Sequence, residues 1–293
     1  MNLESKEVFD SLRKQYQCPY SIGDLTPTLC HLFGVPAPEQ CGGEVIPEIA
    51  DQADKLMNGE GKTRRAVLFC ADALGENQRQ HFTEDFELIE KTAGFRIRSA
   101  SVMPSVTPVC YGTVFTGAAP CVHGIRKYEK PVIRIETLFD VFAGAGKNVA
   151  ILAANGCSID TIFRGRQADY YSFHSNRPGG LTGADQQAFE FTRRFIREDA
   201  YDLLICYMTD YDHQMHGSGP FSPEAAAQAH LAAKRFKQLQ EDMDRYWAKY
   251  NRVLVFVPDH GGHYTDETHG GHGSEREEDM IVNHYYRVCE KEG

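Results

Sequence analysis

The fold is indicated first by an apolar run that ends in a carboxylate, Ala66-Val67-Leu68-Phe69-Cys70-Ala71-Asp72. Two other apolar runs also end in polar residues: residues 203–208 lead to Asp212, and residues 253–257 lead to Asp259-His260. In open α/β sheets, ligands bind outside the carboxyl ends of the parallel strands. The three runs therefore predict strands whose carboxyl ends bring together acids that are distant in sequence.

Short apolar runs alternate with amphipathic stretches along the chain, which is typical of a mostly parallel sheet with helices on both faces. We therefore expect one three-layer α/β domain over residues 1–293, without a large cap domain. Residues 50–65, which are polar and include Asn58-Gly59-Glu60-Gly61, are expected to form a connection on the surface. The expected strands are 66–71, 95–102, 148–153, 170–173, 203–208 and 253–257, and the expected helices are 108–115, 135–143, 183–197 and 223–250.

The composition is that of a globular protein with a substantial core, because 42% of its 293 residues are hydrophobic. A formal net charge of -10 argues against binding to nucleic acid polymers or anionic membranes, which are held by surplus Lys and Arg. The nine cysteines are odd in number and never spaced as C-x-x-C, so neither a disulfide framework nor a cysteine-rich zinc site is indicated. The charged N-terminus lacks an apolar signal region, and we expect a cytoplasmic protein.

Acids and histidines form a candidate metal site at the predicted strand ends. Asp212 and His216 are four residues apart and would meet on one helical turn or tight loop. The glycine-rich segment 268–273, which contains His269 and His272, cannot pack a core and is better interpreted as a metal-binding turn. Oxygen and nitrogen ligands without thiolate suit zinc and leave manganese possible. If one of His269 and His272 is a ligand, the candidates number six, with Asp72, Asp212, His216, Asp259 and His260. Six ligands exceed the needs of one open tetrahedral site, so two divalent ions, ~3.5 to 4 Å apart, fit the count better.

The candidate nucleophile is Thr107, in a segment that leaves a strand and starts a helix at Thr107-Pro108. A hydroxyl at a helix N-terminus lies in positive potential and beside free backbone N–H groups, which favours an alkoxide and a bound phosphate. The alternative is that Thr107 only caps the helix before a proline at the first helical position. Ser105 and Cys110 are rival nucleophiles.

With these motifs in order, residues 66–280 resemble the alkaline phosphatase superfamily, most closely its type I phosphodiesterase/nucleotide pyrophosphatase branch. The motifs that carry the resemblance occur in the family's order. They are the strand ending in Asp72, Thr107 with the Thr-Gly-x-x-Pro-x-x-His-Gly-Ile segment at 116–125, Asp212-x-x-x-His216-x-x-Gly219-Pro220, Asp259-His260-Gly261, and His272-Gly273 ahead of Glu278-Asp279-Met280.

The resemblance implies a double displacement, in which Thr107, activated by metal, attacks phosphorus and forms a phosphothreonine-type intermediate that activated water then cleaves. His272 fits the family spacing to Glu278-Asp279-Met280 better than His269, which remains the alternative ligand. The ligands implied are Asp72, Thr107, Asp259 and His260 for one ion, and Asp212, His216 and His272 for the other.

Some residues depart from the family pattern. The nucleotide pyrophosphatase branch has an asparagine that helps bind a phosphoryl oxygen where this chain has Cys110, and a thiol is a weaker donor. The sulfatase branch has an arginine where this chain has Tyr111, which argues against a sulfatase. Cys110 and Tyr111 are the candidate substrate contacts. Further contacts are possible from the aromatic residues Tyr128 and Phe163 and from the basic residues Arg126, Lys127, Arg164 and Arg166.

The N-terminal segment 23–38 resembles the Asp-x-x-Pro-Thr-x-x-x-x-x-Gly-x-x-x-Pro segment that superfamily members carry after their last metal histidine. Our hypothesis is a circularly permuted or transposed element, in which residues 20–50 pack beside a strand at 280–287 as a C-terminal piece normally does. The alternative is an ordinary capped helix that begins near Thr26-Pro27 and ends at Gly34.

The function that the sequence favours is a metal-dependent phosphodiesterase or nucleotide pyrophosphatase that acts on a small phosphorylated substrate. A phosphomonoesterase of the same superfamily is the near alternative. A phosphomutase is disfavoured, because the stretch between Thr107 and Asp212 reads as core strands and helices rather than as an inserted cap domain. A catalytically silent metal- or ligand-binding module is the alternative of another class.

Overall fold

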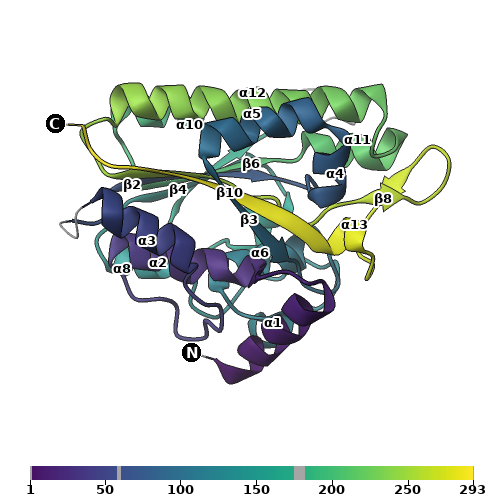
Figure 1. Cartoon of the computed structure of the whole chain (residues 1–293), viewed down its shortest axis with the longest axis horizontal. Helices are drawn as coiled ribbons and strands as arrows, with labels where there is room; N and C mark the ends of the chain where they lie inside the picture. Colours follow the sequence, from purple (N-terminus) through teal and green to yellow (C-terminus); the bar gives the residue numbers. More distant parts are fainter. Residues whose placement is uncertain (1, 58–60, 175–181, 293) are drawn as a thin grey trace.

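A central eight-stranded sheet organises the computed structural model, which describes residues 2–57, 61–174 and 182–292 (Figure 1). The strand order is β1-β3-β10-β7-β2-β6-β4-β5. All neighbouring strands are parallel except at β10, which is antiparallel to both β3 and β7. The strands are β1 (Tyr20–Ser21), β2 (Arg65–Ala71), β3 (Phe95–Ala100), β4 (Val149–Ala154), β5 (Asp169–Phe173), β6 (Leu203–Met208), β7 (Arg252–Phe256) and β10 (Ile281–Cys289), with β8 (His263–Tyr264) and β9 (Gly270–Gly271) in a separate pair.

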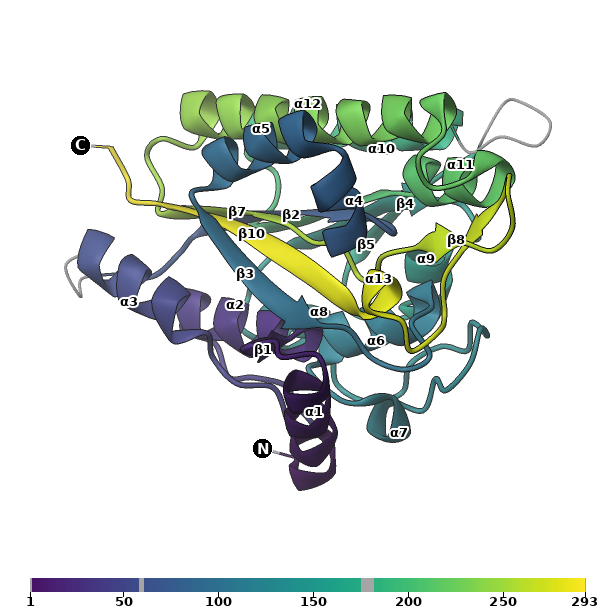
Figure 2. The ribbon, with the colours of Figure 1, turned by 45° about the vertical axis from the view of Figure 1, so that its right-hand side comes forward.

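Helices cover both faces of the sheet (Figures 1 and 2). The long helices α5, α10 and α12 lie on one side, and α2, α3, α6 and α8 lie on the other. The described helices are α1 (Leu3–Gln15), the 3-10 turn η1 (Ile22–Asp24), α2 (Leu25–Phe33), α3 (Pro47–Leu56), α4 (Glu76–His81), α5 (Thr83–Ala93), α6 (Thr107–Thr116), α7 (Pro120–His123), α8 (Leu138–Gly144), α9 (Ser158–Ile162), α10 (Thr182–Glu198), α11 (Asp210–Ser218), α12 (Pro223–Tyr246) and α13 (Glu277–Met280).

Strand β2 shows why the central runs are continuously apolar. Its alternate side chains belong to two different cores: Leu68 and Cys70 face one, and Val67 and Phe69 face the other. Since helices cover both faces, a polar residue on either side of such a strand would lose water without gaining a partner. The expected three-layer, mostly parallel α/β architecture is therefore confirmed.

The six expected strands and four expected helices are all present, with ends that shift by a few residues. The helix expected at 223–250 ends earlier, at Tyr246. The connection expected at 50–65 is shorter than predicted, because Pro47 starts helix α3, which continues to Leu56. Residues 58–60 of that connection lie outside the described part of the chain.

Residues 20–50 lie against the side of the sheet formed by β3 and β10. Strand β1 pairs in parallel with β3, and helix α3 packs against β10. Helix α2 ends at Gly34, which adopts φ 68° as a helix-terminating glycine does. A position far from β10 would have contradicted the transposed-element hypothesis and is not observed, so the hypothesis stays a prediction.

Within the described residues, no helix is both long enough and apolar enough to cross a membrane.

Candidate metal centre and active site

The three polar strand ends meet because β7, β2 and β6 are consecutive, parallel strands of the sheet. Asp72 follows β2 directly, and its backbone N–H donates to Met208 O at the end of β6 (3.1 Å). Helix α11, which begins just after β6, carries Asp212 and His216. Asp259-His260 follows β7 and lies fully buried beside Asp72. The topology therefore produces the convergence that the sequence predicts.

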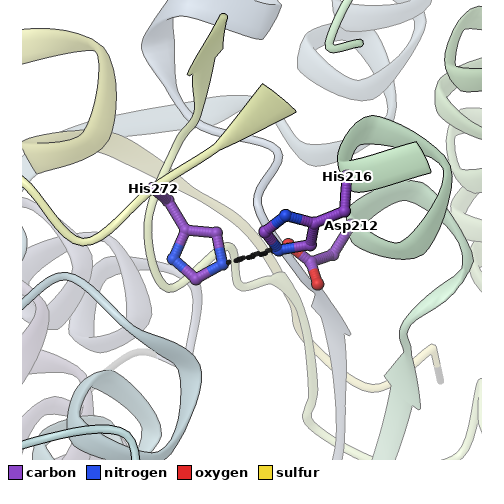
Figure 3. A group of neighbouring side chains, drawn as sticks. All are labelled: Asp212, His216 and His272. Carbon is purple, nitrogen blue, oxygen red and sulfur yellow. Dashed lines mark hydrogen bonds and ion pairs between the residues drawn. The ribbon is translucent and has the colours of Figure 1, made fainter. Parts of the chain in front are cut away.

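Two overlapping groups of side chains have the spacing of metal ligands. One contains Asp212, His216 and His272 (Figure 3), and the other contains Asp72, Asp212 and His260. Within each group the candidate ligand atoms lie within 4.8 Å of one another. Asp212 belongs to both groups, whereas the family resemblance assigns it to one ion only. The structure therefore places this carboxylate between the two candidate positions.

The histidine tautomers favour cation binding at this place. The Nδ1 atoms of His216, His260 and His272 lie 2.9–3.1 Å from the backbone carbonyls of Gly270, Gly261 and Ser105. A carbonyl only accepts, so each Nδ1 carries a proton, and each Nε2 presents a lone pair to the cluster whenever its ring is neutral. The Nε2 atoms of His216 and His272 are 3.1 Å apart, and each lies 3.4 Å from Asp212 Oδ1. Such converging lone pairs repel one another unless a cation or a proton lies between them.

His269 lies outside both groups. Its side chain is exposed, and its Nδ1 is 3.1 Å from the Asp266 carboxylate. Asp259 also lies outside the two groups, but its Oδ2 is 3.4 Å from His260 Nε2. Within the described chain, Asp259 Oδ2 and Asp212 Oδ1 are buried oxygens without a hydrogen-bond donor. Because an unpartnered buried carboxylate oxygen is costly, both oxygens fit coordination to a cation.

The electrostatics of the cluster agree with this fit. Burial and the nearby Asp212 raise the pKa of Asp72 to about 7, and burial with Asp72 nearby raises the pKa of Asp259 well above its usual value. Burial lowers the pKa of His260. Burial opposes the charge on both Asp212 and His272, but their interaction lowers the pKa of Asp212 and raises that of His272 to about 9. Divalent cations would supply the positive charge that stabilises the ionised forms of Asp72 and Asp259.

Thr107 is the first residue of helix α6, and its side chain does not cap the helix. The N-cap is Val106, without a side-chain capping bond. The buried Thr107 Oγ1 instead lies 3.3 Å from His260 Nε2 and 3.5 Å from each carboxylate oxygen of Asp72. The hydroxyl therefore faces the second ligand group, and the capping interpretation is wrong.

The rival residues on this segment face away from the cluster. Ser105 Oγ donates to Ser274 O, and the fully buried Cys110 Sγ lies 3.3 Å from Ser101 Oγ. Tyr111 is also fully buried, and its hydroxyl donates to Val257 O. Neither Cys110 nor Tyr111 lines the cavity beside the cluster, so the geometry does not support the substrate contacts expected of them.

A cavity of about 660 Å³ opens beside the cluster, and Asp72, Thr107, Asp212, His216 and His272 contribute to its wall. The sequence analysis assigned no role to several other residues of the wall, and Tyr207 and Lys130 are among them. Tyr207 lies within the apolar run of β6, and its hydroxyl donates to Asp72 Oδ2. Tyr128 also lines the cavity, whereas Phe163, Arg126, Lys127, Arg164 and Arg166 do not.

Comparison with known proteins gives a family and a fold. The sequence model of the type I phosphodiesterase/nucleotide pyrophosphatase family matches residues 71–280. Phosphonoacetate hydrolase from Sinorhizobium meliloti 1021, solved with phosphonoacetate, is 20% identical with a TM-score of 0.51; the match covers 70% of this chain and 59% of that one. Murine ectonucleotide pyrophosphatase/phosphodiesterase 5 is 16% identical with a TM-score of 0.53, over 69% of this chain and 58% of that one.

The C-terminal periplasmic domain of EcEptC from Escherichia coli, solved with Zn, is 12% identical with a TM-score of 0.50, over 79% of this chain and 74% of that one. These likenesses confirm the expected alkaline phosphatase-like fold. This chain spans less than two thirds of the length of the hydrolase and murine structures. No curated protein sequence matches it.

Proposed function

Because the chain belongs to the type I phosphodiesterase/nucleotide pyrophosphatase family, we propose that it is a metal-dependent hydrolase of phosphoric ester or phosphoanhydride bonds. Thr107 is its nucleophile, and two divalent ions are its cofactors. The observation that carries this proposal is the position of Thr107 Oγ1, which lies within 3.5 Å of Asp72 and His260, two members of a candidate ligand group. Asp212 links that group to the other.

Each ion has its own set of proposed protein ligands in this chain. When bound, the ions would neutralise charge that develops on the transferred phosphoryl group and on the attacking oxygen. The donor set of carboxylates and imidazoles suits zinc, with manganese as the alternative. The proposed ligands are Asp72, Thr107, Asp259 and His260 for one ion and Asp212, His216 and His272 for the other, with Asp212 able to reach both.

The residues of this chain suggest a two-step displacement. A bond forms between Thr107 Oγ1 and phosphorus as the bond from phosphorus to the leaving oxygen breaks, and the leaving group departs with its electron pair. Water then attacks phosphorus and releases the threonine oxygen, so the net change is hydrolysis. The positive end of helix α6 favours negative charge on Thr107 Oγ1 and on the bound phosphoryl oxygens.

Similar structures support a small phosphorylated substrate and a threonine with an essential role. The murine relative has been solved as an inactive threonine-to-alanine variant in complex with AMP. Phosphonoacetate hydrolase has been solved with phosphonoacetate. In this chain, the net charge of -10 also disfavours a nucleic acid polymer as the substrate.

The test compares Thr107→Ala with Ser105→Ala, which removes a neighbouring hydroxyl that donates to Ser274 O. Both variants are assayed with monoester, diester and sulfate chromogenic substrates in Zn and in Mn, and metal content is measured in parallel. We expect Thr107→Ala to lower turnover by roughly 10³-fold or more, with two ions still bound, and Ser105→Ala to remain active.

Retained turnover in Thr107→Ala would contradict the assignment of the nucleophile. A metal-free protein that hydrolyses none of the substrates would contradict the whole proposal and favour a binding module. The ratio of diester to monoester hydrolysis distinguishes the phosphodiesterase from the phosphomonoesterase alternative.

A further inference from the structure

The irregular segment between helices α7 and α8, residues 124–137, forms part of the cavity wall. Tyr128 and Lys130 of this segment line the same cavity as Thr107. Two hydrogen bonds hold the segment in place, one from Lys130 Nζ to Gly156 O in the turn before α9 (2.9 Å) and one from Ile133 N to Ile162 O at the end of α9 (2.8 Å). Lys130 is therefore held at the cavity by its own contacts.

Lys130 is the sole lysine or arginine among the described residues that line this cavity. Within the described chain, its ammonium makes no ion pair with a carboxylate, although lysines and arginines elsewhere often do. A lysine ammonium has three N–H donors, and Gly156 O accepts from one of them. Two donors and a full positive charge remain available to a ligand in the cavity.

Tyr128 adds an aromatic surface beside this charge. Its side chain is 63% exposed, which is unusual for a large apolar residue in this protein. The centre of its ring lies 5.8 Å from Lys130 Nζ. Tyr128 lines the same cavity as the candidate ligands Asp72 and Asp212. Tyr128 and Lys130 therefore place an aromatic ring and a positive charge in the wall of one cavity, together with the candidate ligands.

We propose that Lys130 binds a second anionic group, a carboxylate or a phosphate, on the leaving group of the substrate, and that Tyr128 packs against the atoms between the two charged ends. This inference rests on the proposed function and narrows it. The preferred substrate is a small phosphoester or phosphoanhydride whose leaving group is itself negatively charged. A neutral alcohol as the leaving group would leave the lysine charge without a partner.

The test measures binding by isothermal titration calorimetry with stable phosphonates and the metal-loaded protein. The probes are 4-phosphonobenzoate and 4-phosphonobenzamide, which have nearly the same shape and differ by one negative charge. We expect the wild-type protein to bind the benzoate about tenfold more tightly, because a partly desolvated ion pair adds affinity of this order. Benzene-1,4-diphosphonate distinguishes the two anions: tighter binding than the benzoate assigns the position to a phosphate.

The informative variant is Lys130→Met, and its matched control is Lys127→Met. Lys127 lies three residues earlier in the same segment, but it pairs with Glu129 and does not line the cavity. We expect Lys130→Met to reduce the tenfold preference to roughly twofold or less, Lys130→Arg to retain most of it, and Lys127→Met to retain all of it.

Three results would overturn the inference: equal binding of the two probes by the wild-type protein, no binding of either probe, or an unchanged preference in Lys130→Met. Turnover of 4-carboxyphenyl phosphate and its diesters is measured separately. A preference for the benzoate that depends on Lys130, without any turnover, would contradict the proposed function while supporting the anion-binding role of Lys130.

Discussion

The substitution Glu76→Gln should destabilise the protein at neutral pH and have little effect in strong acid. Glu76 is buried at the start of α4. Its carboxylate accepts hydrogen bonds from Arg79 Nε (2.7 Å), Gln80 Nε2 (2.9 Å) and Asn283 Nδ2 (2.6 Å). Since Asn283 belongs to β10, this carboxylate fixes α4, which follows Asp72 closely in the chain, to strand β10 of the sheet.

The magnitude follows from the pKa of the Glu76 carboxyl. Burial opposes its ionisation, but hydrogen bonds from Arg79, Gln80 and Asn283 lower its pKa from 4.5 to about 2. At about 1.4 kcal/mol for each pH unit, this difference corresponds to on the order of 3 kcal/mol of stability from the ionised form. A depressed pKa in the folded state stabilises the protein above the unfolded pKa, and the contribution is lost as the pH falls from 4.5 toward about 2.

The assay is urea denaturation at several pH values for the wild-type protein, Glu76→Gln and the control Glu87→Gln. Glu87 is exposed and pairs only with Lys91 on the same helix, so its substitution should change the free energy of unfolding by less than about 0.5 kcal/mol. We expect the Glu76→Gln penalty to be about 2–3 kcal/mol at neutral pH and to shrink as the pH is lowered. A penalty under about 0.5 kcal/mol at neutral pH, or one that does not depend on pH, would refute this reasoning.

Three further predictions concern the candidate site. Asp212→Asn should lower the content of both ions, because this carboxylate belongs to both ligand groups, whereas His216→Ala should lower the content of one. Metal content is measured by elemental analysis, and an equal loss in the two variants would contradict this prediction. Burial and nearby Asp212 raise the pKa of Asp72 to about 7, so ions compete with a proton below that pH. The apparent metal affinity, measured by competition with a chelator, should therefore rise up to about tenfold per pH unit toward pH 7, and more slowly above it until His272, with its pKa raised to about 9, also loses its proton. Tyr207→Phe removes the donor to Asp72 and should lower metal affinity about 10–100-fold without loss of fold; calorimetry showing unchanged affinity would exclude this positioning role.

The sequence predicted the central strands of the sheet well, because the features that identify them lie within short, continuous stretches of sequence. The runs of β2, β6 and β7 are apolar on both faces and end in polar residues, so their type and their functional ends are both visible in the sequence. The outer elements were harder to predict. Helix α1 buries only Ser5, Phe9 and Leu12, and its remaining residues carry little apolar pattern. Such helices depend on tertiary packing more than on their own sequence.

Side-chain contacts across the fold were not visible in the sequence. Tyr207 looks like another apolar strand residue, and only the register that pairs it with Cys70 places its hydroxyl beside Asp72. Cys110 lies about one turn after Thr107 on α6, where the helix has already entered the core. Lys130 lies in an irregular segment without periodicity, so no pattern indicates which way its side chain points.

The position of β10 has a consequence for how the chain is made. This strand, the last one along the described chain, lies between β3 and β7 and is the connection through which β1 and β3 join the rest of the sheet. During synthesis the ribosome therefore completes Asp72, Thr107, Asp212 and His260 before the sheet can close. Until β10 emerges, β3 and β7 expose unpaired backbone groups and apolar surface. The sheet thus depends on late, long-range pairing by its last described strand.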